Sequence, residues 1–399
     1  AEEKDRIELA LLYTRDAADS LADILDGPSS YLVMAGNNAE MRAGSGMFLS
    51  VGRVDFAGGR LQLSDFESTG DLHLDEGVAY RDRDLEERWG FAHPNREWRN
   101  LALSPRFPPN AEMATRMWRE AEGRASDGVL ALDVVGLQAF LTATGPVDVG
   151  ELTVDADNVQ QLLLHDQYTG DPDQAARRDQ LAEIARAVLE AFDSSTPDLP
   201  ALAQALRVAV EGRHLMMWSR DATDQRAWEQ AGVSGAVGDH DVLVGLMNRG
   251  GNKLDQYLSV EGRVRTRSVV EGSLVTVRLT VENEVPDGEP DYIAGEGEYG
   301  LYDGFFALTM PGDSELVDTS VPEAVAAGPD GDTRVLAIPV LISQGDTVEW
   351  KVSFVVPPEV ASVTVGPSAR VPKLEWWGPD GLRWNDLDTP RQSVPLPAR

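Results

Sequence analysis

Two kinds of hydrophobic periodicity divide the chain. Between about residues 30 and 250, segments with apolar residues at helical spacing alternate with short apolar runs that are typical of buried strands. The clearest helix spans 179–192, and its apolar face consists of Leu181, Ile184, Ala185, Val188, Leu189 and Phe192. This alternation predicts a sheet layered with helices, an α/β domain that we place at residues 28–258.

The same pattern gives the expected elements. Residues 1–27 form a separate N-terminal helix, because helical spacing stops at Gly27-Pro28. Further helices are expected at 110–123, 136–144, 155–165, 179–192 and 199–212, and strands at 31–35, 47–56, 60–65, 129–134 and 214–218. The stretch 66–110 is polar and aromatic without a clear period, so we expect it to be irregular.

The pattern changes after about residue 260. Apolar and polar residues now alternate, with the apolar positions at Val275, Val277, Leu279, Val281, Val348, Trp350, Val352 and Phe354. A period of two is typical of strands that have one face in water. Because Gly, Pro and Asp turns separate these runs, the sequence predicts an all-β sandwich of the immunoglobulin-like type at residues 259–399.

A polar, glycine-rich segment follows the first strand of the α/β domain. The apolar run 31–35 is followed by Gly36, Asn37, Asn38, Glu40, Arg42, Gly44, Ser45 and Gly46, and a second apolar run follows at 47–51. A buried strand that ends in such a loop is where α/β folds place ligand sites. A plain turn between two strands explains the same residues, and both interpretations stay open at this point.

The charge of the chain limits the classes of partner. Its 399 residues include 67 acidic and 35 basic side chains, a formal net charge of −32. Such a surface repels nucleic acids and anionic lipid headgroups at long range, so we expect no nucleic-acid partner. Only four of the bases are lysines. Positive charge is therefore mostly guanidinium, which suits bidentate contacts with phosphate or carboxylate, although codon bias explains the same excess.

Several classes of chemistry are excluded or disfavoured. The absence of cysteine excludes disulfides, thiolate catalysis and zinc–thiolate sites. The five histidines show no metal-binding spacing, and no nucleotide-binding or serine-hydrolase motif occurs. No apolar run approaches the roughly 18 residues of a membrane span. The first residues, Ala1-Glu-Glu-Lys, resemble neither a signal peptide nor a natural start, so we expect an extracellular, cell-surface ectodomain whose membrane anchor was removed upstream.

A set of motifs occurs in order over about residues 28–260. They are Tyr31-Leu-Val-Met with Asn37-Asn38-Ala-Glu40-Met-Arg42, Ser104-Pro-Arg-Phe-Pro-Pro, Asp127-Gly-Val-Leu-Ala-Leu-Asp133, Leu141-Thr-Ala-Thr-Gly-Pro-Val147, His165-Asp-Gln-Tyr168, Arg213-His-Leu-Met-Met-Trp-Ser219, and Asn248 to Tyr257. Together they resemble a family of actinobacterial envelope proteins, domain of unknown function 4012. That family name implies no activity.

The order of elements also resembles the LytR-CpsA-Psr wall-polymer ligases, which transfer a glycan phosphate from a polyprenyl carrier to peptidoglycan. The segment Asn37–Arg42 corresponds to their first loop, and Arg177-Arg178-Asp179-Gln180 corresponds to the arginine-rich start of a long helix. The resemblance implies a mixed sheet flanked by helices. The chain departs from those ligases near Asp65, where their arginine is missing, and it has Asn37 and Asn38 where they have aspartates.

The resemblance nominates the site residues. Phosphoryl transfer needs cations on the phosphates, often a divalent metal, and an acid or base at the acceptor. The nominated catalytic residues are Arg42, Arg178 and Glu40; the substrate-binding residues are Arg177, Asn37, Asn38, Ser45 and Gln180; Glu40 and Asn38 are candidate Mg²⁺ ligands.

Structural roles compete with these assignments. The two arginines at 177–178 suit a solvated helix start, Arg42 suits an ion pair with Glu40 or another acid, and for Asn248–Asp255 we favour a turn into the β domain.

Two functional hypotheses follow. In the first, the protein binds a polyprenyl-linked or phosphate-bearing glycan and transfers it to peptidoglycan or another wall polymer. In the second, it is a non-catalytic surface or scaffold protein that binds a wall glycan or a protein partner, which the missing arginine near Asp65 favours. A glycosidase with paired carboxylates ranks third, because no pair can be singled out.

Overall fold

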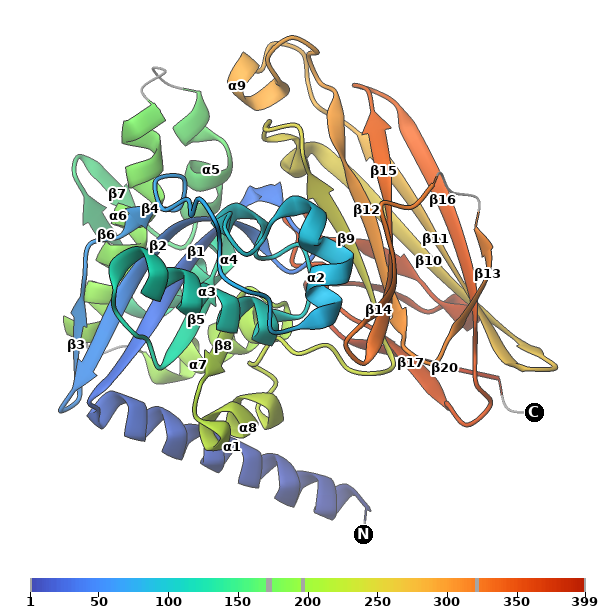
Figure 1. Ribbon diagram of the computed structural model, residues 1–399, viewed down its shortest axis with the longest axis horizontal. Helices are drawn as coiled ribbons and strands as arrows, with labels where there is room; N and C mark the ends of the chain where they lie inside the picture. The colour runs from blue at the N-terminus through green and yellow to red at the C-terminus, as the bar shows by residue number, and fades with distance from the viewer. Residues whose placement is uncertain (1, 170–173, 195–197, 320–322, 398–399) are drawn as a thin grey trace.

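The computed structural model describes residues 2–169, 174–194, 198–319 and 323–397. An α/β domain lies beside a β-sandwich, and helix α1 (Glu2–Asp26) runs along the outside of the α/β domain (Figure 1). None of the described helices is long and apolar enough to span a membrane.

The α/β domain contains a mixed sheet in the order β3-β2-β1-β5-β8, with β4 attached to β2. Its strands are β1 (Ser29–Met41), β2 (Gly46–Ala57), β3 (Arg60–Leu63), β4 (Glu67–Ser68), β5 (Gly128–Leu132) and β8 (Leu215–Ser219). β1 and β5 are parallel, whereas the other pairs are antiparallel. The predicted mixed sheet is confirmed.

Strand β1 is buried on both faces because helices cover the sheet on both sides. Tyr31 and Val33 pack on α4 (Val134–Thr144), α5 (Val159–Leu164), α6 (Gln174–Ser194) and α7 (Leu199–Glu211). Leu32 and Met34 pack toward α2 (Arg83–Trp89) and α3 (Phe107–Glu122) on the other side. An apolar run without alternation is what a strand buried on both faces requires.

The segment 66–110 is more ordered than predicted. It contains α2, which Asp82 caps by accepting a hydrogen bond from the Leu85 amide, and the first turn of α3. α3 begins at Phe107 because two prolines fit its first turn, and it ends at Gly123, whose φ of 68° is left-handed. α8 (Ala222–Gln230) and the short hairpin of β6 (Val147–Val149) and β7 (Leu152–Val154) complete this domain.

Two sheets form the sandwich in the described part of the chain. The outer sheet has the order β13-β16-β11-β10-β18-β19 and the inner sheet the order β14-β15-β12-β9-β17-β20. The strands are β9 (Asp241–Asn248), β10 (Leu258–Val269), β11 (Gly272–Asn283), β12 (Tyr302–Pro311), β13 (Glu315–Thr319), β14 (Ala326–Asp330), β15 (Thr333–Ile342), β16 (Thr347–Val356), β17 (Ser362–Val365), β18 (Glu375–Trp377), β19 (Arg383–Asn385) and β20 (Gln392–Pro395). Their alternating apolar residues meet in one core, as predicted.

The sandwich begins earlier than predicted. β9 pairs with β12 and β17, so the inner sheet starts at Asp241, whereas the sequence pattern places the boundary at 258/259. The inner sheet also packs on the α/β domain, where Met247, Phe305 and Ala337 share a core with Trp89 and Trp98. The two domains are therefore joined by a common hydrophobic core.

Candidate functional site

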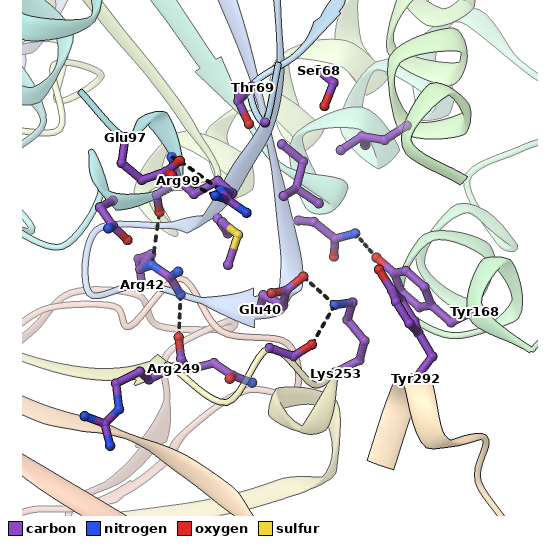
Figure 2. Close-up of a pocket in the computed structure, with 18 of the residues that line it drawn as sticks. Glu40, Arg42, Ser68, Thr69, Glu97, Arg99, Tyr168, Arg249, Lys253 and Tyr292 are labelled. Atoms are coloured by element: carbon purple, nitrogen blue, oxygen red, sulfur yellow. Dashed lines mark hydrogen bonds and ion pairs between the residues drawn. The ribbon is translucent and has the colours of Figure 1, made fainter. Parts of the chain in front are cut away.

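A cavity of about 410 Å³ lies where the end of β1 meets the sandwich. Residues of β1 and β2 form one wall, the segment 97–100 a second, and the segment 248–253 a third (Figure 2). Tyr168 and Tyr292 close one side of the cavity. Its walls thus come from both domains.

The end of β1 reaches the cavity through an irregularity in the sheet. Asn37 pairs with Met47, but the next partner pair is Met41 with Gly46, so residues 38–40 face no residue of β2. A side chain at Gly46 would collide with the Asn37 carbonyl carbon at 2.5 Å, and only glycine allows this close approach. The predicted loop at Gly36 is wrong in extent, because the strand continues to Met41 and the turn follows it.

Lys253 lies at the centre of the polar contacts. Its Nζ is 2.6 Å from Glu40 Oε1, and the side chains of Lys253 and Glu40 are 3% and 10% exposed. The same ammonium group lies 4.7 Å from the ring centre of Tyr292 and 5.3 Å from that of Tyr168. An ammonium ion beside a carboxylate and two aromatic rings is held by electrostatic attraction from several sides.

Arg42 is buried and bound to backbone carbonyls. Its Nε donates to the Arg99 carbonyl oxygen at 3.1 Å, and one Nη donates to the carbonyls of Met41 and Asn248 at 2.9 and 2.7 Å. Among the described residues, no carboxylate lies within ion-pair distance of Arg42, so the predicted alternative of an ion pair with Glu40 is not formed. Burial lowers the pKa of Arg42. This arginine joins three wall segments of the cavity.

Two further arginines line the cavity near its opening. Arg99 makes a two-pronged ion pair with Glu97, at 2.8 and 2.7 Å, and its side chain is 46% exposed. Arg249 binds both carboxylate oxygens of Asp303 at 2.7 and 2.9 Å. Of the described charged residues, four bases and two acids line the cavity. When Asp303 is counted as the partner of Arg249, the bases still exceed the acids by one, in a chain with a net charge of −32.

The nominated asparagines and serine have different places. Asn37 lines the cavity and donates a 2.7 Å hydrogen bond to the Tyr168 hydroxyl. Asn38 lies outside the cavity lining, because its amide donates to Asp133 and the Ala369 carbonyl and accepts from the Val134 amide. Ser45 is buried in the turn and donates to the Gly46 carbonyl oxygen. The structure thus brings Asn37, Glu40 and Arg42 together and leaves Asn38 and Ser45 in supporting positions.

The structure does not test the predicted roles of the arginine pair at the start of α6. The side chains of Arg177 and Arg178 lie outside the described residues, and their predicted roles stay predictions. Gln180 is partly buried but does not line the cavity, whereas its neighbour Leu181 does.

The two predicted Mg²⁺ ligands, Glu40 and Asn38, both contact other protein groups. Glu40 is ion-paired with Lys253, and Asn38 uses both ends of its amide on protein partners. Among the described residues, no group of three or more His, Asp or Glu side chains could hold a metal ion. A metal requirement stays a prediction, and nothing below depends on it.

A buried ion pair supports the floor of the cavity. Asp255 and Arg370 are both fully buried, with 3.3 Å between Oδ1 and the guanidinium. The other Asp255 oxygen accepts hydrogen bonds from the Met41 amide and the Asn248 side chain. Burial raises the pKa of Asp255 against these contacts, and it raises that of the neighbouring Tyr302. These bonds tie the end of β1 to the sandwich.

A second buried cluster lies beneath Asn38. Asp133 caps α4 with one oxygen, and its other oxygen accepts from Asn38 and contacts His214 Nδ1 at 2.7 Å. Burial alone would lower the pKa of His214, but the Asp133 carboxylate outweighs it, and Asp386 adds to the increase. The pKa of His214 is therefore raised.

Sequence reasoning missed most of the positive side of the cavity. Lys253, Arg249 and Asn248 line it, although we favoured a turn for their segment. Arg99, Glu97 and Tyr292 carry no motif that marks them as site residues. One feature of the sequence could have identified this side of the cavity. Lys253 is one of only four lysines, and it lies in a family motif, after two glycines and before Asp255.

The chain is similar to several solved structures at low sequence identity. No curated protein matches the chain. Among solved structures, a transcriptional regulator from Enterococcus faecalis is 13% identical, with 53% of this chain and 75% of that chain covered and a TM-score of 0.29. A putative transcription regulator from Eubacterium siraeum is 10% identical, with 53% and 80% covered and a TM-score of 0.31. TagV from B. subtilis is 10% identical, with 52% and 82% covered and a TM-score of 0.26.

Part of the α/β domain matches a described protein family. Residues 26–168 match the family described as "Protein of unknown function (DUF4012)". This match confirms the predicted resemblance over residues 26–168, whereas the motifs at Arg213–Ser219 and Asn248–Tyr257 lie beyond it. The segment of the chain that carries β1, the bulged strand end and Tyr168 is therefore similar to the DUF4012 family.

Proposed function

We propose that the cavity binds the phosphate of a polyprenyl-linked or phosphate-bearing glycan of the cell envelope, and that the protein works at the cell surface. The observation that carries this proposal is the excess of bases over acids in the cavity wall of a strongly acidic chain. Guanidinium and ammonium groups are the natural partners of phosphate oxygens, and partial burial strengthens their attraction.

Each cation would act differently. Lys253, which is almost fully buried, supplies a point charge, and Arg99, which is 46% exposed, supplies a planar fork that fits two phosphate oxygens. Arg42 holds the walls in place through its carbonyl contacts. Because these groups are positioned before a ligand arrives, binding would require little rearrangement.

The test is calorimetric binding of farnesyl pyrophosphate, with and without Mg²⁺. A hydrogen bond to a charged group contributes about 1.5–3 kcal/mol, so Arg99→Gln should weaken binding at least about tenfold. Arg83→Gln is the matched control, because Arg83 forms an exposed ion pair with Glu87 on α2. Lys253→Met, with the exposed Lys373→Met as its control, tests the buried ammonium group of the cavity. Equal affinities for Arg99→Gln and Arg83→Gln, or no binding by the wild type, would refute the proposal.

Transfer of the glycan is the finer form of this proposal. An acceptor hydroxyl oxygen of peptidoglycan or another wall polymer would bond to phosphorus while the bond to the carrier phosphate breaks, and the hydroxyl proton would pass to Glu40. The polyprenyl phosphate would leave.

A non-catalytic binding protein is the second candidate, and one observation favours it. Glu40 and Arg42, both nominated for catalysis, already hold protein partners. Glu40→Gln distinguishes the two candidates. If Glu40 only neutralises Lys253, the variant should bind the pyrophosphate more tightly; if Glu40 is the base, transfer to a peptidoglycan fragment should also be lost.

A further inference from the structure

The outer sheet of the sandwich carries positive side chains in one row across its strands. Arg263 on β10 lies opposite Arg278 on β11, which lies opposite Lys351 on β16. On the other side, Trp377 on β18 lies opposite Arg263, and Arg383 on β19 lies opposite Trp377. We call Arg383, Arg263, Arg278 and Lys351 the cationic row. With strands spaced by about 4.7–4.9 Å, its four inter-strand steps span about 19 Å.

Strand β10 extends this positive surface along its length. Arg265 and Arg267 follow Arg263 at every second position and are exposed on the same face. Two adjoining hollows of about 510 and 320 Å³ lie on this face and share Arg263, Arg265 and Arg278 in their lining. The face points away from the α/β domain, which packs on the inner sheet.

Neutralisation of these charges is incomplete. Arg278 pairs with Glu349, and Lys351 lies 2.6 Å from Asp318. Within the described ranges, no carboxylate lies at ion-pair distance from Arg263, Arg265 or Arg267.

Trp377 lies between Arg263 and Arg383 and contacts both side chains. The guanidinium groups of Arg263 and Arg383 lie 5.9 and 5.0 Å from the centre of its ring. Its buried neighbour Trp376 stacks on Trp384 at 5.8 Å and fixes strand β18. The two arginines are therefore oriented by an anchored aromatic side chain.

The row brings like charges onto neighbouring strands. Like charges directly opposite each other destabilise a sheet, and the row places Arg263, Arg278 and Lys351 side by side on three adjacent strands. The two hollows are lined by five basic side chains and by three acidic ones, Glu261, Glu349 and Asp318. In a chain with 67 acidic residues against 35 bases, this surplus of cations is a local exception. The core beneath it is supplied by the inward residues of the same strands. The exception calls for a negatively charged ligand.

We propose that the outer face of the sandwich binds a linear anionic glycan whose phosphate or carboxylate groups contact the cationic row and the neighbouring Arg265 and Arg267. A chain that crosses the strands at right angles meets a new cation at nearly every strand. Thr276 and Ser353 line the same hollow, lie 3.0 Å apart through their hydroxyl oxygens, and offer these hydroxyl groups to sugar hydroxyls. This surface is separate from the cavity and lies on one domain, so it does not depend on the function proposed for the cavity.

Charge density separates the glycan from other polyanions. Duplex DNA carries one charge per about 1.7 Å, and a protein of net charge −32 repels it strongly at long range. A glycan with one anion per sugar or per few sugars is repelled less, while short-range contacts with guanidinium groups are retained. The hydroxyl-bearing side chains in the hollow favour a sugar chain over an acidic peptide.

The test compares three polymers that share one backbone: dextran, carboxymethyl dextran and dextran phosphate. Binding of the full chain is measured by biolayer interferometry at increasing salt. The variant Arg263→Gln/Arg265→Gln/Arg267→Gln changes exposed residues only. The control Arg60→Gln/Arg83→Gln/Arg207→Gln removes the same total charge from exposed positions on the α/β domain. We expect binding of at least one anionic dextran, a loss of at least about tenfold in the first variant, and no loss in the control.

The choice between the two anionic dextrans identifies phosphate or carboxylate as the recognised group. Equal loss in both triple variants, or equal binding of neutral dextran, would overturn the proposal, because total charge or the backbone would then explain the result. Tighter binding of poly-dT or polyglutamate than of either dextran would overturn the assignment to a glycan. Arg99→Gln should leave this binding unchanged, and the first triple variant should leave pyrophosphate binding unchanged, so the two proposals fail independently.

Discussion

The cavity and the outer face of the sandwich both gather positive charge in an acidic protein, but they hold it differently. In the cavity, Lys253 and Arg42 are almost fully buried and each is bound by carboxylate or carbonyl oxygens. On the sandwich, the side chains of Arg263, Arg265 and Arg267 are exposed to solvent. Burial makes an unpaired charge expensive, so cavity cations need protein partners, whereas exposed cations are stabilised by solvent. The cations of the cavity are therefore held more firmly before a ligand binds than Arg265 and Arg267 on the face.

The largest effect is expected for Asp255→Ala, which tests this contrast in the buried cluster next to the cavity. It leaves Arg370 buried without a carboxylate and frees the Met41 amide, so we expect a loss of about 3–5 kcal/mol in the free energy of unfolding. Asp303→Ala, which breaks the exposed pair with Arg249, should cost less than about 1 kcal/mol. Urea denaturation measures both. Similar losses in the two variants would show that burial does not separate the pairs.

A smaller effect should appear in the pH dependence of stability. The pKa of His214 is raised in the folded protein by Asp133, so the protonated form is favoured on folding. Its contribution is complete below the unfolded pKa of about 6.5 and declines as the pH rises through the folded-state value. Melting temperatures from pH 5.5 to 9 should therefore fall more steeply for the wild type than for His214→Gln. Parallel curves would mean that His214 is neutral in the fold.

The smallest effect is expected on the sandwich face. Arg263→Gln removes one of three adjacent like charges, so the free energy of unfolding should stay within about 0.5 kcal/mol of wild type or rise slightly. Urea denaturation at low and high salt checks this. A clear destabilisation would assign the arginine to the fold and weaken the case for a ligand.

The sequence was sufficient for elements whose pattern is local. The alternation around Val275–Val281 and the apolar face of 179–192 predicted β11 and α6, because one buried face fixes the spacing of apolar residues. The extension of β1 to Met41 was missed, because glycine and asparagine usually mark turns. Here Gly36 and Asn37 pair with Phe48 and Met47 of β2, and the Met41 amide donates to Asp255, which is distant in the sequence.

The candidate site was predictable only on its β1 side. Glu40 and Arg42 stood out beside glycines, but their partners Lys253 and Asn248 are distant in sequence, and no local pattern joins them. β9 was assigned to the wrong domain for a similar reason. Its apolar run fits any buried strand, and only pairing with β12 and β17 identifies its sheet.

The hydrophobic core shared by Trp89, Trp98 and the inner sheet has a consequence for how such chains diversify. A sandwich that buries part of its neighbour's core cannot be exchanged by recombination at the loop before β9 without exposing large aromatic side chains. The two domains therefore behave as one structural unit and not as modules joined by a linker. New binding properties are then gained most readily on the solvent-exposed face of the outer sheet, because substitutions there leave the shared hydrophobic core intact.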